Sequence, residues 1–262
     1  MQHSLWMVEK VLWTLSVLGS ALVVWRLYSL DLHLTYRFFF LNMALSVARS
    51  LALLPFGPRT PIYYKIWVST EPILWVSYIL VVYELYSLVL KQYQGIYSLG
   101  RWFFFAAVAT SSIVATLSVL TTNSTNALGS NLPLIFPYVL FERLAFTSLA
   151  IFLFLLLALI AWFPVPLSRN LLIHGTIYTG YFFVNNVLMM FFHISGPEAA
   201  SLVSDARLST AIVCYACWIL RLSRSGEDRV TSLRLGRSPV EERRMLVHLD
   251  TLNATLLRSA RK

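Results

Sequence analysis

The stretch FERLAFTSLAIFLFLLLALIAW (Phe141–Trp162) decides the fold, because its only charged side chains are Glu142 and Arg143. A helix needs about 20 mainly apolar residues to cross a hydrocarbon core about 30 Å thick. The whole chain of 262 residues is 58% hydrophobic and only 13% charged, whereas soluble chains carry about 25% charged residues. The sequence therefore predicts a polytopic membrane protein.

Similar apolar runs recur along the chain, separated by clusters rich in Pro, Gly and polar residues. Continuous runs of this length favour helices, since the strands of a membrane barrel are about 10 residues long and alternate in hydrophobicity. We predict an all-α fold whose residues 1–222 form a transmembrane domain. Its seven helices lie near residues 5–26, 36–55, 64–90, 102–121, 134–162, 170–193 and 206–222.

The distribution of Lys and Arg predicts the orientation, because loops on the cytoplasmic side carry an excess of both. The connections on one side contain Arg26, Arg37, Lys91, Arg101 and Arg169. The other side carries Arg59, Lys65 and Arg207, and Asn123 in a possible glycosylation sequon. Ten basic residues follow the last span: Arg221, Arg224, Arg229, Arg234, Arg237, Arg243, Arg244, Arg258, Arg261 and Lys262. We therefore place the C-terminus in the cytoplasm and the N-terminus outside, in a plasma or inner membrane; the basic residues thus indicate topology, and nucleic acid is not expected as a partner.

The tail, residues 223–262, contains a predicted amphipathic helix at about 239–259. Ser238 is a suitable N-cap, Pro239 suits the first helical position and Glu241 completes a capping box. An apolar stripe follows at helical spacing, made of Met245, Leu249, Leu252 and Leu256. Such a helix binds either an anionic lipid surface or a partner protein, and the sequence favours neither.

Two halves of the chain resemble one another. Aligning Glu9 with Glu142 also aligns Asn42 with Asn185, and Gly57–Pro58 with Gly196–Pro197. We predict parallel repeats at about 5–90 and 134–222, joined by the linker helix 102–121. In helix count, orientation and repeat scheme the chain is similar to SWEET-type sugar carriers and, more loosely, to microbial rhodopsins. It departs from both families: neither the first nor the fifth span has a proline in its interior, and the last span has no lysine for a retinal Schiff base.

Several polar side chains fall at one depth in the outer third of the predicted bundle. An ionisable group inside a membrane costs about 2.5–3.5 kcal/mol on insertion scales, so each one implies a partner or a hydrated cavity. The residues of this polar layer are Glu9, Lys10, Arg49, Glu71, Glu142, Arg143, Asn185 and Asn186. Its acids and bases balance, and we predict that Glu9, Arg49, Glu71, Glu142 and Arg143 converge inside the bundle.

Two interpretations of this layer stay open. In the first, ion pairs and amides clasp the helices and fix their register, without any ligand. In the second, the layer lines an outward cavity that binds a small polar or zwitterionic molecule. Glu84 is the one acid in the inner half, and it is either hydrated at the boundary or a proton or cation site.

His33 and His174 occupy matched positions at the inner ends of their spans. Two histidines at one depth are potential axial ligands of haem, but hydrated interfacial histidines are the favoured interpretation. We therefore expect neither a cofactor nor a metal, since a zinc site needs about three clustered His, Asp or Cys ligands.

Three functional classes remain, in this order. The first is a protein that binds or transports a small polar solute. The second is a non-catalytic, receptor-like or accessory subunit of a membrane complex that docks through its C-terminal helix. A membrane enzyme comes third, because the sequence offers no nucleophile, metal cluster or acid–base pair.

Overall fold

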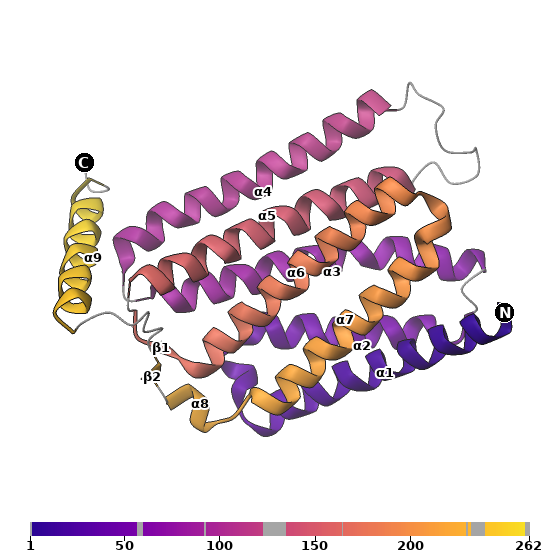
Figure 1. The fold of residues 1–262 in the computed structure, drawn as a ribbon, viewed down its shortest axis with the longest axis horizontal. Coiled ribbons are helices and arrows are strands. Elements are labelled where there is room, and N and C mark those ends of the chain that lie inside the picture. The colour runs from indigo at the N-terminus through magenta and orange to yellow at the C-terminus, as the bar shows by residue number, and fades with distance from the viewer. Residues whose placement is uncertain are drawn as a thin grey trace.

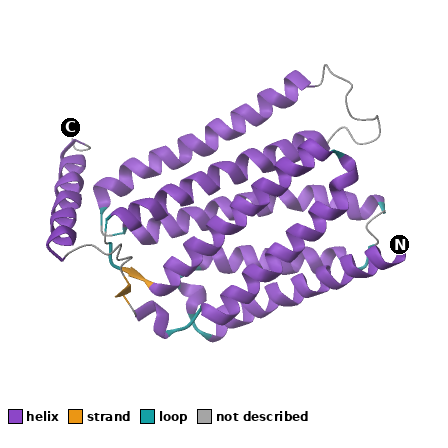
Figure 2. Ribbon diagram, in the orientation of Figure 1, coloured by secondary structure: helices purple, strands orange, loops and turns teal. Residues whose placement is uncertain are grey.

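The computed structural model describes residues 2–56, 60–91, 93–122, 135–163, 165–228, 230–231 and 239–259. Nearly all of them are helical (Figure 2), so the all-helical prediction is confirmed. The long helices of the bundle are α1 (Gln2–Ser29), α2 (Arg37–Leu53), α3 (Pro61–Leu90), α4 (Gln94–Thr122), α5 (Ile135–Trp162), α6 (Arg169–Ser195) and α7 (Ala200–Arg221).

The long helices run side by side (Figure 1), and six of them close into a ring. Going round the ring, α1 contacts α2, α2 contacts α3, α3 contacts α5, α5 contacts α6, α6 contacts α7, and α7 returns to α1. Helix α3 also contacts α6 across the middle, and α4 lies outside the ring against α5 and α3. The N-terminus and the C-terminal helix α9 (Pro239–Ser259) lie at opposite ends of the bundle. We call the end that carries α9 the tail end, and the opposite one the far end.

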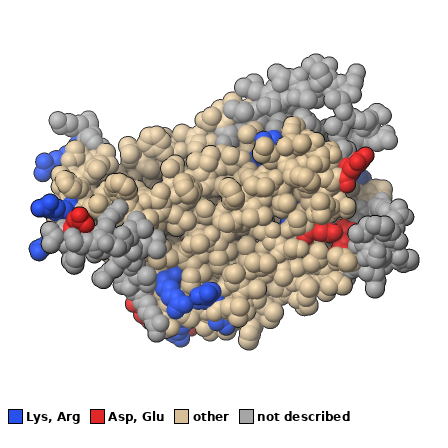
Figure 3. All heavy atoms as spheres, viewed as in Figure 1, with Lys and Arg blue, Asp and Glu red and all other residues tan. Residues whose placement is uncertain are grey.

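The surface has the charge pattern of a membrane-embedded protein. In the space-filling view a broad uncharged band separates charged side chains that gather toward the two ends (Figure 3). Among the described residues five helices are long and apolar enough to cross a membrane: Val8–Ser29, Pro61–Leu90, Phe141–Trp162, Arg169–Ser195 and Ala200–Arg221. Helix α2, with 17 residues, is shorter than these.

Two helices begin well before their predicted starts. The predicted linker helix begins at residue 102, but α4 begins at Gln94; the last span was expected from 206, but α7 begins at Ala200. In both cases the extra turns are polar enough to resemble a loop in the sequence. The early start of α7 matters most, because it places Arg207 two turns inside a helix. Asn123 lies outside the described residues.

Short polar elements close the tail end of the bundle. Strand β1 (Leu167–Ser168) pairs antiparallel with β2 (Val230–Thr231), and the single-turn helix α8 (Ser225–Asp228) lies between α7 and β2. The Tyr36 hydroxyl donates to Glu227 Oε2 over 2.9 Å, and the Asn170 amide donates to the same oxygen over 3.2 Å. Glu227 therefore ties the start of α2 to the start of α6.

Helix α9 spans the residues predicted for the amphipathic helix, and it docks on the first turn of α4. The Oδ1 atom of Asn253 accepts from the backbone N–H of Gly95 at 2.7 Å and of Ile96 at 3.4 Å. These N–H groups are among those that the first turn of a helix leaves unpaired. Leu249, one turn before Asn253, is buried. The Asn253 amide oxygen thus caps the polar first turn of α4.

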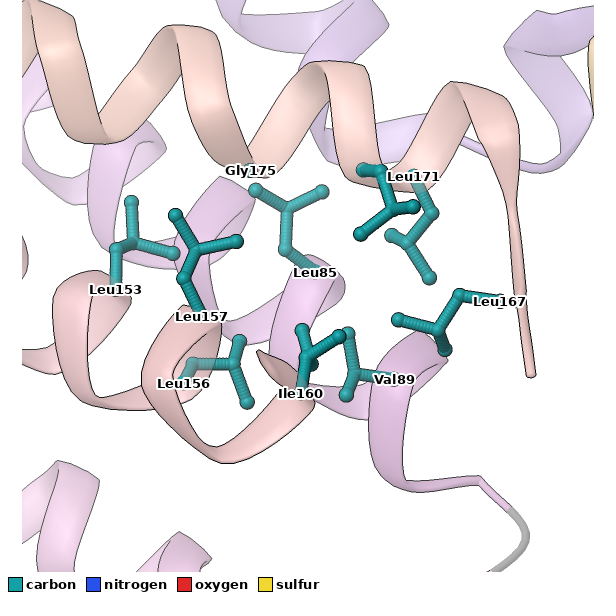
Figure 4. Close-up of a pocket in the computed structure, with 10 residues that line it drawn as sticks. Leu85, Val89, Leu153, Leu156, Leu157, Ile160, Leu167, Leu171 and Gly175 are labelled. Carbon is teal, nitrogen blue, oxygen red and sulfur yellow. The ribbon is translucent and has the colours of Figure 1, made fainter. Parts of the chain in front are cut away.

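The bundle interior is tightly packed. The core cavity between α3, α5 and α6 has a volume of about 10 Å³, which is at the limit for one water molecule. Its lining consists of aliphatic side chains such as Leu85, Leu153 and Leu171, together with Gly175 (Figure 4). A void with such a lining stays dry, so this cavity is a packing feature.

The two members of the predicted repeat share some environments but differ in others. Asn42 and Asn185 are both fully buried, whereas Glu142 is buried and Glu9 is exposed. The alignment that pairs Glu9 with Glu142 therefore joins residues in unlike surroundings, and the repeat stays a prediction.

Replacing Gly95 with valine is expected to release α9 from α4. A Cβ atom at Gly95 would lie 2.4 Å from the backbone oxygen of Asn253, inside any van der Waals contact. Proteolysis of the purified protein should then cut residues 239–259 faster than in the parent. Gly180→Val is the matched control, since a Cβ atom there meets nothing within 4 Å. Equal cleavage of the two variants would contradict the docking.

Candidate functional site

Four charged side chains meet near the far end of the bundle, and we call them the charge cluster: Arg49, Glu71, Glu142 and Arg207. Arg49 on α2 forms an ion pair with Glu71 on α3. Arg207 on α7 forms an ion pair with Glu142 on α5. The two pairs are close enough for the charges of one to act on the other. The cluster thus joins four helices and has no net charge.

The acids of the cluster are more buried than the bases. The Glu142 side chain is 4% exposed, while that of its partner Arg207 is 28% exposed. Arg207 Nε also donates to Asn185 Oδ1 over 3.0 Å, which adds α6 to the cluster. Because burial of an unpaired charge costs several kcal/mol, these contacts are what hold Glu142 in the interior. Of the four side chains of the cluster, that of Arg207 is the most exposed.

The structure brings only part of the predicted polar layer together. Arg49, Glu71 and Glu142 belong to the charge cluster, and Asn185 accepts a hydrogen bond from its fourth member, Arg207. Glu9 and Lys10 instead lie exposed on α1, so the predicted convergence is wrong for Glu9.

The two remaining members of the predicted layer lie beside the cluster. Arg143 is half-buried, and its backbone carbonyl accepts from the Thr147 hydroxyl at 2.7 Å. The same hydroxyl donates to Asn186 Oδ1 over 2.6 Å, linking α5 to α6. Arg143 forms no ion pair among the described residues, and its neighbour Glu142 is paired with Arg207 of α7 instead.

A line of polar side chains, the polar seam, runs along the inner face of α6. Its members follow helical spacing: Asn170, His174, Tyr178, Tyr181 and Asn185. The seam extends over about 22 Å of helix, most of the thickness of a hydrocarbon core. It leads from the charge cluster at Asn185 to the tail-end contact between Asn170 and Glu227.

Hydroxyl and amide groups on α2 and α3 face the seam. The hydroxyls of Tyr181 and Tyr78 lie 3.2 Å apart. Tyr178 donates to Asn42 Oδ1 over 3.4 Å, and the Asn42 amide donates to the Ser77 hydroxyl over 2.6 Å. The contact of α6 with α2 and α3 therefore contains a series of hydrogen-bonded polar groups. Membrane helices usually pack apolar residues at such contacts.

His174 lies in the middle of this seam without a polar partner. Its ring is fully buried among Tyr36, Phe39 and Trp218, with centroid distances of 4.5, 4.5 and 6.2 Å. Neither ring nitrogen has a hydrogen-bond partner among the described residues. The interpretation of His174 as a hydrated interfacial histidine is therefore wrong, because the aromatic rings exclude water.

His33, the other candidate for haem ligation, has a different environment. It is half-buried and stacks on Tyr28 at 5.1 Å, with Phe40 at 5.8 Å. The two histidines thus sit in separate aromatic surroundings. Within the part of the chain that the structure describes, no three His, Cys, Asp or Glu side chains lie close enough together to hold a metal ion.

Glu84, the predicted inner acid, caps a helix. Its carboxylate oxygens accept from the backbone N–H groups of Phe38 and Phe39 at 3.0 and 3.1 Å. Both belong to the first turn of α2, where N–H groups lack intrahelical partners and the helix dipole favours a negative charge. This contact accounts for a buried acid at that depth.

Replacing His174 with leucine tests whether the buried imidazole has a hidden polar partner. Leucine has a similar volume, and the loss of two nitrogens without partners removes no hydrogen bond. The free energy of unfolding should therefore change by less than about 1.5 kcal/mol. Asn185→Leu should cost more, because it leaves Arg207 Nε unpaired. Thermal unfolding of both variants is the measurement, and a larger loss in His174→Leu would contradict the environment described here.

Two groups of the site are missing from the predicted polar layer: Arg207 and the tyrosines of the seam. In the sequence Arg207 falls at the outer end of the predicted last span, because the polar residues before it hide the start of α7. The spacing of 4, 4, 3 and 4 residues from Asn170 to Asn185 is the signal that shows the seam in the sequence, because it keeps every member on one face of a helix.

Comparison of the chain with family models, with curated proteins and with solved structures finds no match.

Proposed function

We propose that this protein is a carrier of seven transmembrane helices that binds a small zwitterionic solute, such as a free amino acid, at the charge cluster. In this proposal the far end faces outward and the tail end faces the cytoplasm, as the Lys and Arg distribution favours. Helix α4 joins two three-helix units, which suits its position outside the ring. The observation that carries the proposal is the polar seam, because it links the charge cluster to the opposite end of the bundle.

The cluster has the charges that a zwitterion requires. A solute carboxylate would pair with Arg207, the most exposed base, while its ammonium group would replace the guanidinium beside Glu142. Asn185 Oδ1, which accepts from Arg207, is a second acceptor for that ammonium group. The Glu142–Arg207 pair would thus be replaced by two pairs, one between Glu142 and the solute ammonium group and one between Arg207 and the solute carboxylate. Every buried charge keeps a partner, so binding does not leave Glu142 unpaired.

Binding at this position would also loosen the bundle. The Glu142–Arg207 pair holds α5 to α7, and the Arg49–Glu71 pair holds α2 to α3. A solute that takes over these charges favours a state in which the helix pairs separate, which is a shift between two conformations. The hydroxyl and amide groups of the seam would then offer the solute polar contacts toward the tail end.

A thermal-shift experiment on the purified protein tests the binding. The probes are free amino acids, compared with amino acid amides, which lack the carboxylate, and N-acetylated amino acids, which lack the ammonium group. A ligand at 100 times its Kd stabilises the folded state by about 2.7 kcal/mol, and we expect this only for zwitterions. The double variant Glu142→Gln/Arg207→Gln should fold and lose the response.

The control is a double variant that removes an ion pair on the surface. Asp31→Asn/Arg224→Gln removes an exposed ion pair at the tail end, with side chains 60% and 75% exposed, and should keep the response. The proposal fails if no zwitterion stabilises the parent, or if the Glu142→Gln/Arg207→Gln protein responds as the parent does.

A receptor-like or accessory subunit is the second candidate, favoured by the docking of α9 on α4. Asn253 caps the first turn of a membrane helix, so a displacement of α4 would move the tail. If the protein is a receptor, zwitterions should change the protease sensitivity of residues 239–259 without being taken up into vesicles.

A further inference from the structure

We propose that α9 is an interfacial helix that lies in the headgroup region of the bilayer and binds an anionic lipid surface. The first observation is its direction. In Figure 1, α9 runs across the tail end, transverse to the long helices. Where the long helices follow the membrane normal, a transverse helix at their end lies in the plane of the membrane. This inference is independent of the proposed carrier function.

The depth of α9 follows from aromatic residues at the tail end. Tryptophan and tyrosine are enriched where membrane helices pass the headgroups. Four of them are 60–71% exposed near the tail-end termini of α1, α4 and α5: Trp25, Tyr28, Trp102 and Trp162. Asn253 caps α4 at Gly95, about 10 Å along the helix from Trp102. Helix α9 therefore lies just outside this aromatic belt.

One side of α9 is apolar, and α4 covers only part of it. Leu249 is 1% exposed at the contact, whereas Leu252 on the same side is 51% exposed. At 100° per residue Leu252 lies about 60° from Leu249, while the 58%-exposed Val247 lies about 160° away. Leu252 thus extends the apolar side of α9 past the edge of α4.

The charge of the tail end fits an anionic surface. Residues 223–262 contain nine Lys or Arg and five Asp or Glu. Arg243, Arg244 and Arg258 are exposed on α9, and Lys91 and Arg101 are exposed beside it at the tail end. The exposed acid Asp250 lies near the bundle: burial raises the pKa of the Tyr93 phenol, and the Asp250 carboxylate raises it further. Basic residues beside an apolar stripe are the usual pattern of a helix that binds anionic lipid.

Spin labelling of the full chain in nanodiscs tests the proposal. In a background that replaces Cys214 and Cys217 with alanine, a nitroxide is attached at Leu252→Cys or, as the matched control, at Val247→Cys. The nanodiscs contain phosphatidylcholine alone or mixed with phosphatidylglycerol. We expect the label at 252 to collide mainly with oxygen, which concentrates in lipid, and the label at 247 mainly with a water-soluble nickel chelate.

Anionic lipid should move the label at 252 deeper into the bilayer, which increases its collisions with oxygen. A salt concentration of 1 M, which shortens the Debye length to about 3 Å, should reverse this shift. The proposal is overturned if the label at 252 is in water with phosphatidylglycerol present, or if lipid charge has no effect. Dipolar broadening at 252 would assign the surface to a second copy of the chain instead. Where the cysteine-free protein does not fold, hydrogen exchange of residues 239–259 in the unlabelled parent decides: exchange equally fast in both lipids overturns the proposal.

Discussion

Replacing Arg207 with alanine should lower the free energy of unfolding by about 3–5 kcal/mol, the typical cost of removing one partner of a buried ion pair. Glu142 is the reason, because its side chain is 4% exposed and Arg207 is its ion-pair partner. The variant leaves a carboxylate in an apolar interior, and the Asn185 amide oxygen loses its donor as well. Thermal or denaturant unfolding in a lipid nanodisc measures the loss.

Two comparisons separate this effect from a general loss of packing. Glu142→Gln in the Arg207→Ala protein should recover most of the stability, because it removes the stranded charge. Arg224→Ala is the matched control: its ion pair with Asp31, at 3.5 Å, is exposed and is worth less than about 1 kcal/mol. An Arg207→Ala protein as stable as the Arg224→Ala protein would mean that Glu142 is hydrated.

Replacing Trp218 with alanine should lower the free energy of unfolding by about 3 kcal/mol. The indole is 2% exposed and packs on Phe39, Tyr178 and Tyr215, at centroid distances of 4.9, 5.0 and 6.2 Å. In soluble proteins such a change costs about 3–5 kcal/mol. We expect the lower value, because lipid chains are as apolar as the core and only the lost packing counts.

The control for Trp218 lies two residues further along the same helix. Leu220 is 78% exposed, so Leu220→Ala removes contacts with lipid rather than with protein. Unfolding measured under the same conditions should show little change. If Trp218→Ala were as stable as Leu220→Ala, the aromatic contacts between α2, α6 and α7 would not support the bundle.

The sequence predicted the all-helical membrane character and the bounds of α9 because both depend on local patterns. A long apolar run such as the one ending at Trp162 is typical only of a membrane helix. The bounds of α9 could be predicted because its capping residues lie next to its apolar stripe in the sequence. The predicted starts of α4 and α7 were wrong, because there the local pattern is misleading. Their first turns are polar and resemble loops in the sequence, and the cap on α4 comes from Asn253, which is far away in the chain.

The site was predicted only in part, because depth alone does not say which way a side chain points. Glu71 and Glu142 are buried, but Glu9, which has a local sequence similar to that of Glu142, is exposed. The pairing of Glu142 with Arg207 joins residues 65 positions apart in the chain. Such a partner follows from the helix arrangement, which the sequence alone did not supply.

Uptake of free amino acids into vesicles tests the carrier proposal most directly. The purified parent and the charge-swapped Glu142→Arg/Arg207→Glu protein are reconstituted into liposomes, and the accumulation of radiolabelled amino acids is followed. The swap keeps an ion pair between α5 and α7 but reverses the charges that a solute meets. We predict uptake by the parent, and a swapped protein that regains stability over Arg207→Ala without uptake. Equal uptake by the two proteins, or none by the parent with any amino acid, would contradict the proposal.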